Sequence, residues 1–353
     1  MNNKVRFQIY GFLLSLIFVN CQEPQAEFPL SPTPAFYHWQ THLSLTSRER
    51  GYLDSLGVQR LYAKFFDVDW DAGAAMGVPL AQIQIDTQYL DDLQIIPTIF
   101  ITNRCMLNLP QGDVGELANN IYNLIYRLGQ QLPNWQPAEI QIDCDWSSQS
   151  REKYFALLKA LRQRMTDPIA LSATIRLHQL KYADQTGIPP VDRGMLMFYN
   201  MGDLEDWQEP NSILNLDKAR PYLSGDYALP LDLALPIFHW GVVFRERALV
   251  HLSHALDTTV LQDTLHFHKI GPGRFQIMKS TYLDGYYLYK DDLIRLEGVD
   301  QKALLEASRM LKTQINQIEP RVAFYHLDSS TIKNFPYDSL RACLEELAKT
   351  SLE

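Results

Sequence analysis

The strongest constraint on the fold is an alternation of strand-like and helix-like segments that runs from residue 35 to the end of the chain. The strand-like segments are apolar and rich in β-branched or aromatic residues, which is typical of parallel strands buried on both faces. They cover residues 35–40, 60–68, 94–102, 139–145, 169–177, 194–200, 232–240 and 321–327. Amphipathic helices are predicted at 46–56, 113–131, 149–165, 300–317 and 337–349. Strand and helix repeated about eight times predicts an α/β fold, a single (β/α)8 TIM-type barrel.

The alternation is weakest between residues 203 and 320. Residues 203–230 are rich in Pro and Asp, and residues 241–299 contain no clean strand-helix unit. The run Gly271-Pro272-Gly273 between two short strand-like segments indicates a β-hairpin. We therefore predict one barrel domain over 35–350 with an insertion at 241–299, after the seventh strand. A separate small domain is the alternative.

The N-terminus has the three parts of an export signal. Lys4 and Arg6 precede an apolar stretch from Phe7 to Val19, and Cys21 follows. This arrangement resembles a bacterial lipoprotein signal, although Asn20 stands where a small residue is usual. The resemblance implies a signal peptide at 1–20, a lipid on Cys21, a flexible tether at 21–34 and an exported lipoprotein of the cell envelope, in the periplasm or at the outer-membrane surface. An ordinary signal peptide or a signal anchor is the alternative.

Net charge and cysteine content limit the partners and the covalent cross-links that this chain can have. The formal net charge of −9 argues against a nucleic-acid partner, because phosphate binding needs clustered Lys and Arg. Beyond Cys21, the cysteines Cys105, Cys144 and Cys343 are odd in number and widely spaced, which suggests buried apolar side chains and no disulfide framework. No pattern in the sequence calls for a cofactor.

Two carboxylates stand at the end of the fourth predicted strand, where a barrel carries its functional residues. Asp143 and Asp145 are two residues apart, so we expect their side chains on one face, roughly 6–7 Å apart. Carboxylates that close repel each other, and one of them can hold a proton near neutral pH. This spacing suits acid–base catalysis, with Asp143 and Asp145 as candidate catalytic residues.

Aromatic and polar residues recur at the other predicted strand ends. An indole or phenol ring at such a place can stack against the apolar face of a sugar. Each aromatic residue alone also fits a buried core. The candidate substrate-binding residues are Trp39, Trp70, Trp146, Trp240, Tyr199, Asn200, Arg176, His178 and His239. For Arg176, a structural ion pair with an inward-facing aspartate is the alternative role.

The two best-defined strand ends resemble those of family 18 glycoside hydrolases, the chitinase-like barrels. In that family the fourth strand ends in Asp-x-x-Asp-x-Asp-x-Glu and the sixth carries Met-x-Tyr-Asp. Asp143 and Asp145 match the last two aspartates, and Met197-Phe198-Tyr199-Asn200 nearly matches the second motif. The resemblance implies that Asp145 orients a substrate acetamido group and that Tyr199 supports it. Ile140 replaces the first aspartate, and Ser147 replaces the glutamate that is the general acid. The fourth-strand end also looks similar to an uncharacterised barrel family of secreted bacterial proteins.

Other residues could complete a catalytic site. Asp67 and Asp69 alternate at the end of the second strand, and either could form a cross-barrel pair with Asp145, as glycoside cleavage requires. A solvated loop is the alternative for them. Four histidines, His38, His178, His239 and His326, lie near other strand ends and could converge on a metal, although no tight spacing supports a metal site.

The sequence thus leaves three functions open. The first is a membrane-anchored glycoside hydrolase-like barrel that acts on or binds carbohydrate, with Asp69, Asp143 and Asp145 as candidate carboxylates. The second is a catalytically inactive barrel that binds a glycan or a protein. The third is a metal-dependent hydrolase.

Overall fold

Eight parallel strands close into a barrel in the computed structural model, which describes residues 30–165, 168–223 and 225–349. Closure follows from β1, which pairs with both β18 and β3. The barrel strands are β1 (Thr33–His38), β3 (Arg60–Asp71), β6 (Gln94–Ile101), β7 (Glu139–Cys144), β8 (Ala170–Ile175), β9 (Arg193–Met197), β10 (Leu231–Pro236) and β18 (Arg321–Tyr325). The predicted (β/α)8 barrel is confirmed. The predicted signal peptide and the predicted lipid site at Cys21 lie outside the described residues.

The inside of the barrel is lined by polar side chains that satisfy one another. Glu139 and Gln141 are alternate residues of β7, so their side chains lie on the same face of the strand and point into the barrel. The Tyr37 hydroxyl donates to Gln141 Oε1 at 2.6 Å, and the Ser172 hydroxyl donates to Glu139 Oε1 at 2.5 Å. Arg321 forms an ion pair with Glu139, which is 1% exposed. These buried contacts hold the strands in register, and the barrel centre is filled.

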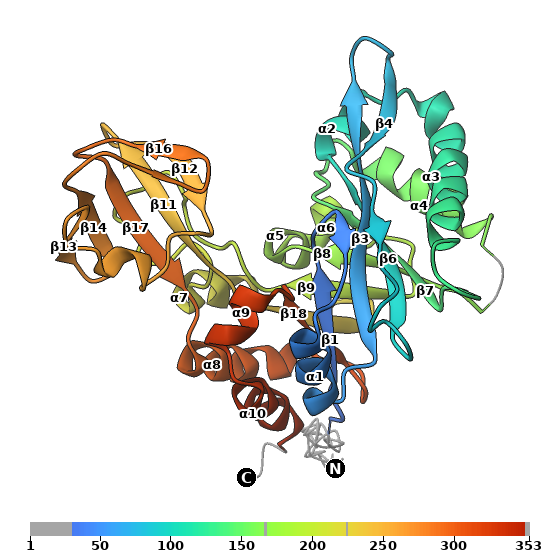
Figure 1. The fold of residues 1–353 in the computed structure, drawn as a ribbon. Coiled ribbons are helices and arrows are strands. Elements are labelled where there is room, and N and C mark those ends of the chain that lie inside the picture. The colour runs from blue at the N-terminus through green and yellow to red at the C-terminus, as the bar shows by residue number, and fades with distance from the viewer. Residues whose placement is uncertain (1–29, 166–167, 224, 350–353) are drawn as a thin grey trace, which may run out of the picture.

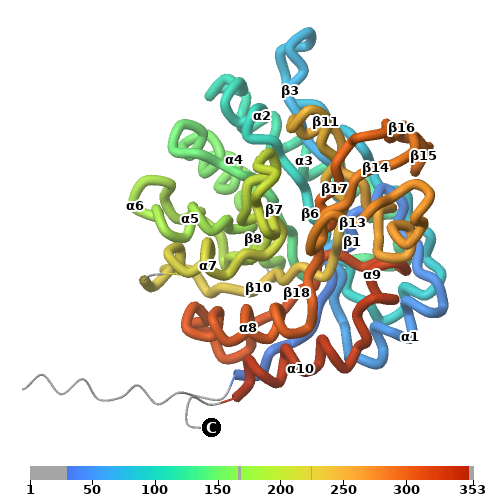
Figure 2. The backbone as a smooth tube through the Cα atoms, turned by 90° about the vertical axis from the view of Figure 1, so that its left-hand side faces the viewer, coloured from blue at the N-terminus to red at the C-terminus, as the bar shows by residue number. Residues whose placement is uncertain are grey.

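Helices cover most of the outside of the barrel, and Figure 2 shows them arranged around the strands. A capping box between Thr46 and Glu49 starts the first helix, and Gly57 ends it with a left-handed φ of 69°. The helices are α1 (Ser47–Leu56), α2 (Asn103–Asn108), α3 (Val114–Gly129), α4 (Arg151–Arg162), α5 (Leu177–Lys181), α6 (Ala183–Thr186), α7 (Leu216–Ala219), α8 (Gln301–Leu311), α9 (Ser329–Asn334) and α10 (Tyr337–Ala348). No described helix spans a membrane, since none is both long and apolar enough.

Between β3 and β6 the chain makes a hairpin where the repeat would place a helix. The outer end of β3 pairs with β4 (Met76–Leu80), and the hairpin projects beyond the barrel rim (Figure 1). A two-residue ladder joins β2 (His42–Leu43) to β5 (Gln84–Ile85). The second predicted strand, 60–68, therefore extends to Asp71 because its last residues gain an antiparallel partner.

The chain leaves the barrel after β10 and builds a second, smaller β-structure, which confirms the insertion after the seventh strand (Figure 1). Its five-stranded sheet has the order β12-β11-β17-β14-β13 and its own core around Val243, Leu256 and Ile294. These strands are β11 (His239–Arg245), β12 (Ala248–Ser253), β13 (Phe267–Gly271), β14 (Arg274–Ile277) and β17 (Leu293–Gly298). A hairpin of β15 (Thr281–Leu283) and β16 (Tyr286–Leu288) completes it.

Two predicted strand ends are wrong. The segment 232–240 is two strands, because β10 ends at Pro236 and β11 begins at His239 in the inserted sheet. The segment 194–200 ends early, at Met197, because the chain turns and Asn200 takes a positive φ of 56°. Both differences lie at the barrel mouth, where the strand pattern gives way to loops.

Candidate functional site

The carboxyl ends of β7, β8 and β9 surround a pocket with a cavity volume of about 320 Å³. It is lined by Asp145, Arg176, Leu177, His178, Met197, Tyr199, Asn200, Met201, Lys218 and Tyr222. We call it the mouth pocket. The structure thus brings together Asp145, Arg176, His178, Tyr199 and Asn200, which the sequence placed at three different strand ends. Pockets of roughly 300–1,000 Å³ with a few convergent polar groups are typical of small-ligand sites.

Asp143 lies beneath the mouth pocket. Its side chain points into the barrel and is 3% exposed. Its Oδ1 accepts a hydrogen bond from the Thr174 hydroxyl at 2.6 Å and one from Arg176 Nη2 at 3.0 Å. Burial lowers the pKa of Arg176, but the nearby carboxylates, Asp143 first among them, raise it by more, so the guanidinium stays charged. Asp143 therefore holds Arg176 in place at the floor of the pocket.

Asp145 differs from Asp143 in its surroundings. β7 ends at Cys144, so Asp145 begins the following loop, and its side chain is 57% exposed. The ring nitrogen Nε2 of His178 lies 3.5 Å from Asp145 Oδ1. Asp145 is the only carboxylate among the described residues that line the mouth pocket. It is the group best placed to accept hydrogen bonds from a ligand.

Aromatic rings form one wall beside the mouth pocket. The ring of Tyr199 lies 5.1 Å from that of Tyr325, and Tyr325 lies 5.9 Å from the ring of Trp39. Lys64 Nζ lies 5.8 Å above Trp39. Burial, followed by the neighbouring Tyr325, raises the pKa of Tyr199, so its phenol remains a hydrogen-bond donor. The wall combines flat apolar surface with fixed polar groups.

Solved structures with a similar fold include several carbohydrate enzymes. The spore cortex-lytic enzyme SleL of Bacillus cereus has a TM-score of 0.55 at 13% identity, over 90% of this chain and 75% of that one. The chitinase of Chromobacterium violaceum has a TM-score of 0.53 at 9% identity, over 89% of this chain and 99% of that one. A chitinase of Bacteroides thetaiotaomicron has a TM-score of 0.52 at 12% identity, over 90% and 96%. The chain shares the barrel fold of these chitinases. No family model and no curated protein matches the sequence.

The barrel does not bring Asp69 to the mouth pocket. Asp69 lies on the outer end of β3 and pairs with Arg104 of α2. The hydrogen bonds from Arg104 and then from Thr102 lower the pKa of Asp69 to about 2. A carboxylate with that pKa is ionised near neutral pH and cannot donate a proton. Asp67 is tied to Lys64 at 3.1 Å. Neither Asp67 nor Asp69 lines the mouth pocket, and a cross-barrel pair with Asp145 stays a prediction.

Three of the predicted tryptophans lie away from the mouth pocket. Trp146 is fully buried in the core, where its Nε1 donates to the Thr186 carbonyl at 2.9 Å. Trp240 is 8% exposed, and its Nε1 donates to Glu297 Oε2 at 2.8 Å in the inserted sheet. Trp70 lies in the β3–β4 hairpin, half-buried against the core. Their ring faces are used for packing, which corrects the expectation that they line a sugar site.

Ser147 occupies the position of the general acid in the chitinase motif. Its backbone N–H donates to the Ser150 hydroxyl at 3.0 Å in the turn that leads into α4. The Ser150 hydroxyl in turn donates to Asn103 Oδ1 at 2.5 Å. A serine in this turn can cap a helix, but it cannot supply a proton as a carboxylic acid does. Because Ser147 replaces the glutamate of the motif, the site has no general acid at this position.

The predicted convergence of four histidines is only partly correct. His38 and His326 lie close enough for the two rings to influence each other's charge, and His254 lies near His326 and His239. His178 is elsewhere, at the mouth pocket. Within the described ranges, no group of three or more His, Cys, Asp or Glu side chains is arranged to hold a metal ion.

Buried His38 gives a prediction for the pH dependence of stability. Burial, and after it the neighbouring His326, lowers the pKa of His38 from 6.5 to about 4. Between pH 6.5 and about 4, His38 binds a proton in the unfolded chain but stays neutral in the folded chain. The free energy of unfolding therefore decreases as the pH falls through this range. The slope from one such group is at most about 1.4 kcal/mol per pH unit.

We expect urea unfolding of His38→Gln to show a flatter pH dependence than the wild type over this window. The exposed His42→Gln serves as the control and should keep the wild-type slope. Equal slopes for the wild type and His38→Gln would contradict the assignment.

Two residues of the mouth pocket were not predicted from the sequence. Lys218 and Tyr222 come from α7 and the turn that follows it, in the Pro- and Asp-rich region without strand or helix pattern. Lys218 forms an ion pair with the buried Glu209. Lys181 Nζ lies 4.8 Å above the ring of Tyr222. Both residues line the pocket, and only tertiary packing places them there.

Proposed function

We propose that the mouth pocket binds carbohydrate. The observation that carries the proposal is the convergence of one exposed carboxylate, one fixed guanidinium and a tyrosine wall on a single cavity. Asp145 and Asn200 accept hydrogen bonds from sugar hydroxyls, Arg176 and His178 donate to sugar oxygens, and Tyr199 offers an apolar edge. The similarity in fold to proteins named chitinases and a cortex-lytic enzyme supports this choice of ligand class.

We further propose binding without cleavage. Glycoside hydrolysis generally uses two carboxyl groups that flank the scissile bond. Here Asp143 is buried in an ion pair with Arg176, and Asp69 is held ionised by Arg104. Ser147 replaces the acid of the chitinase motif. Among the described residues that line the mouth pocket, Asp145 is the one carboxylate that can contact a ligand, which is enough for recognition.

Hydrolysis is the second candidate. The observation that favours it is Asp145, an exposed carboxylate that lies 3.5 Å from His178 at the mouth pocket, since carboxylates and imidazoles are the usual acid–base groups of hydrolases. The two candidates differ in outcome: a hydrolase releases reducing ends from a polysaccharide, and a binding protein does not.

A glycan array followed by calorimetry on the binding glycan tests the mouth pocket. We expect Asp145→Asn to weaken binding by about 10- to 150-fold, since a hydrogen bond to a charged group contributes about 1.5–3 kcal/mol. Asp91→Asn, on an exposed loop before β6, is the matched control and should bind as the wild type does. Equal affinity for Asp145→Asn would remove the proposed site. Reducing ends released by the wild type but not by this variant would establish the second candidate.

We propose that the protein is exported and held at the cell envelope by a lipid on Cys21. The support is the order of charged, apolar and cysteine-bearing segments in residues 1–21. A lipid on this cysteine would keep the barrel within tether length of a membrane. Binding would then take place on an envelope or extracellular glycan.

Metabolic labelling with palmitate and membrane fractionation test this location. We expect the wild type to take up label and to sediment with membranes, and Cys21→Ser to lose the label. Cys343→Ser, which changes a buried thiol of α10, should keep both properties. Label retained in Cys21→Ser would refute the anchor.

A further inference from the structure

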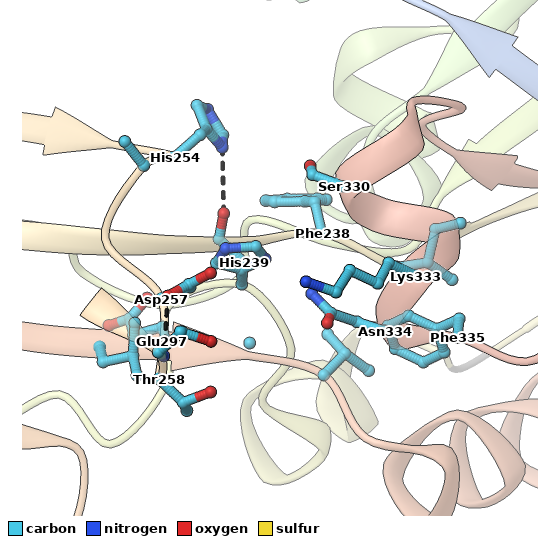
Figure 3. Close-up of a pocket in the computed structure, with 16 residues that line it drawn as sticks. Phe238, His239, His254, Asp257, Thr258, Glu297, Ser330, Lys333, Asn334 and Phe335 are labelled. Carbon is cyan, nitrogen blue, oxygen red and sulfur yellow. Dashed lines mark hydrogen bonds between the residues drawn. The ribbon is translucent and has the colours of Figure 1, made fainter. Parts of the chain in front are cut away.

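A second and larger cavity lies between the inserted sheet and α9, with a volume of about 530 Å³ (Figure 3). Phe238 and His239 line it from the β10–β11 connection, and Asp257 and Thr258 line it from the loop after β12. Lys333 of α9 reaches it from the opposite wall. We call it the insertion cavity. None of its lining residues also lines the mouth pocket.

One wall of the insertion cavity carries free hydrogen-bond donors. Lys333 and Asn334 point from α9 towards the inserted sheet (Figure 3). In the ranges that the structure describes, Lys333 forms no ion pair, and the Asn334 amide makes no hydrogen bond. An ammonium group that faces a cavity and has no carboxylate within ion-pair distance is suited to an anionic ligand.

The facing wall offers acceptors that are fixed in place. Asp257 Oδ1 accepts from the backbone N–H groups of Thr259 and Val260, both at 2.8 Å, which orients the carboxylate. His254 Nδ1 lies 3.0 Å from the carbonyl oxygen of His239, which fixes the loop against β11. The second oxygen of Asp257 and the Thr258 hydroxyl are then available for the hydroxyl groups of a ligand.

Apolar surface completes the cavity. Phe238 and Phe335 line it from the two walls, and both are buried, at 4% and 5% exposure. Aromatic side chains in this position accommodate the apolar face of a sugar ring. The cavity thus has a cation on one wall, an oriented carboxylate on the other and an aromatic ring on each. This arrangement fits a ligand with an anionic end, several hydroxyls and a flat apolar face.

We propose that the insertion cavity binds a carboxylated sugar, either a free uronic acid or a glycan end that carries one. Its carboxylate pairs with Lys333, and its hydroxyls donate to Asp257. The volume suits one or two sugar residues. Phe238 also packs against Tyr199 of the mouth pocket, with 6.0 Å between ring centroids, so the two sites lie on either side of one aromatic contact.

Calorimetry of the purified full-length chain with glucuronate, galacturonate and glucose tests the proposal. We expect both uronates to bind at least 10-fold more tightly than glucose. Lys333→Met should lower uronate affinity by at least 10-fold, and Lys333→Arg should restore most of it. Lys290→Met, an exposed lysine elsewhere on the insertion, is the matched control and should leave affinity unchanged. Because Lys333 is exposed, its replacement should not impair folding.

Three results would overturn the proposal. One is equal affinity of the wild type for glucuronate and glucose, including no binding of either. Another is unchanged uronate affinity in Lys333→Met. The third is tighter binding of glutamate than of glucuronate, which would show an amino-acid site. Asp145→Asn should leave uronate binding intact, so failure of the mouth-pocket proposal and failure of this one are told apart.

Discussion

Replacing Arg176 with methionine is expected to lower the free energy of unfolding by about 3–5 kcal/mol, the usual cost of removing one partner from a buried ion pair. The reason is Asp143, which is 3% exposed and whose carboxyl group would be left buried without its ion-pair partner. Urea unfolding followed by tryptophan fluorescence measures the change. Glycan binding should also be lost, because the same guanidinium lines the mouth pocket.

A double-mutant cycle distinguishes the loss of the Arg176–Asp143 ion pair from the loss of packing around Arg176. Arg176→Met combined with Asp143→Leu removes both charges, and we expect it to recover much of the lost stability. Arg309→Met, which breaks an exposed pair with Glu346, is the surface control and should cost about 1 kcal/mol or less. A loss below 1 kcal/mol in Arg176→Met, or no recovery in the double variant, would argue against a buried pair.

Trp146→Ala is expected to destabilise the protein by about 3–5 kcal/mol, as large-to-small changes of buried aromatic residues do. Trp146 is fully buried and stacks on Tyr154 with 5.0 Å between ring centroids. Its Nε1 also donates to the Thr186 carbonyl, so the change removes a buried hydrogen bond as well. Chemical denaturation at neutral pH measures the loss.

The milder Trp146→Phe variant decides between packing and ligand contact. We expect it to fold, to lose part of the stability and to bind glycan with wild-type affinity. Trp39→Phe is the comparison at the aromatic wall and should weaken binding more than it weakens stability. Wild-type stability with lost binding in Trp146→Phe would place this indole at the ligand.

Much of the fold followed from local pattern. Buried parallel strands need apolar residues on both faces, and this requirement marked all eight barrel strands in the sequence. Helices such as α1 could be located from their amphipathic pattern. The hairpin after β3 and the split of 232–240 into β10 and β11 were missed, since a strand's length depends on which partner lies beside its last residues.

The candidate site was predicted only in part, because the direction of each side chain depends on the residue at which its strand ends. Parallel strands bring their carboxyl ends to one mouth, so Asp145, Arg176 and Tyr199 could be expected together. Which way each side chain turns depends on where its strand stops. β7 stops at Cys144, which leaves Asp143 inside the barrel, Asp145 in solvent and Trp146 in the core.

The sequence by itself determined the barrel, its insertion after the seventh strand and the residues that gather near its mouth. These features depend on periodicity and on parallel pairing, which are local properties repeated along the chain. Tertiary structure alone decided that Asp69 forms an ion pair with Arg104 and that Lys218 and Tyr222 line the mouth pocket. It also decided that Lys333 faces Asp257 across the insertion cavity. Each of these depends on the distance between segments far apart in the chain, and no local pattern encodes that distance.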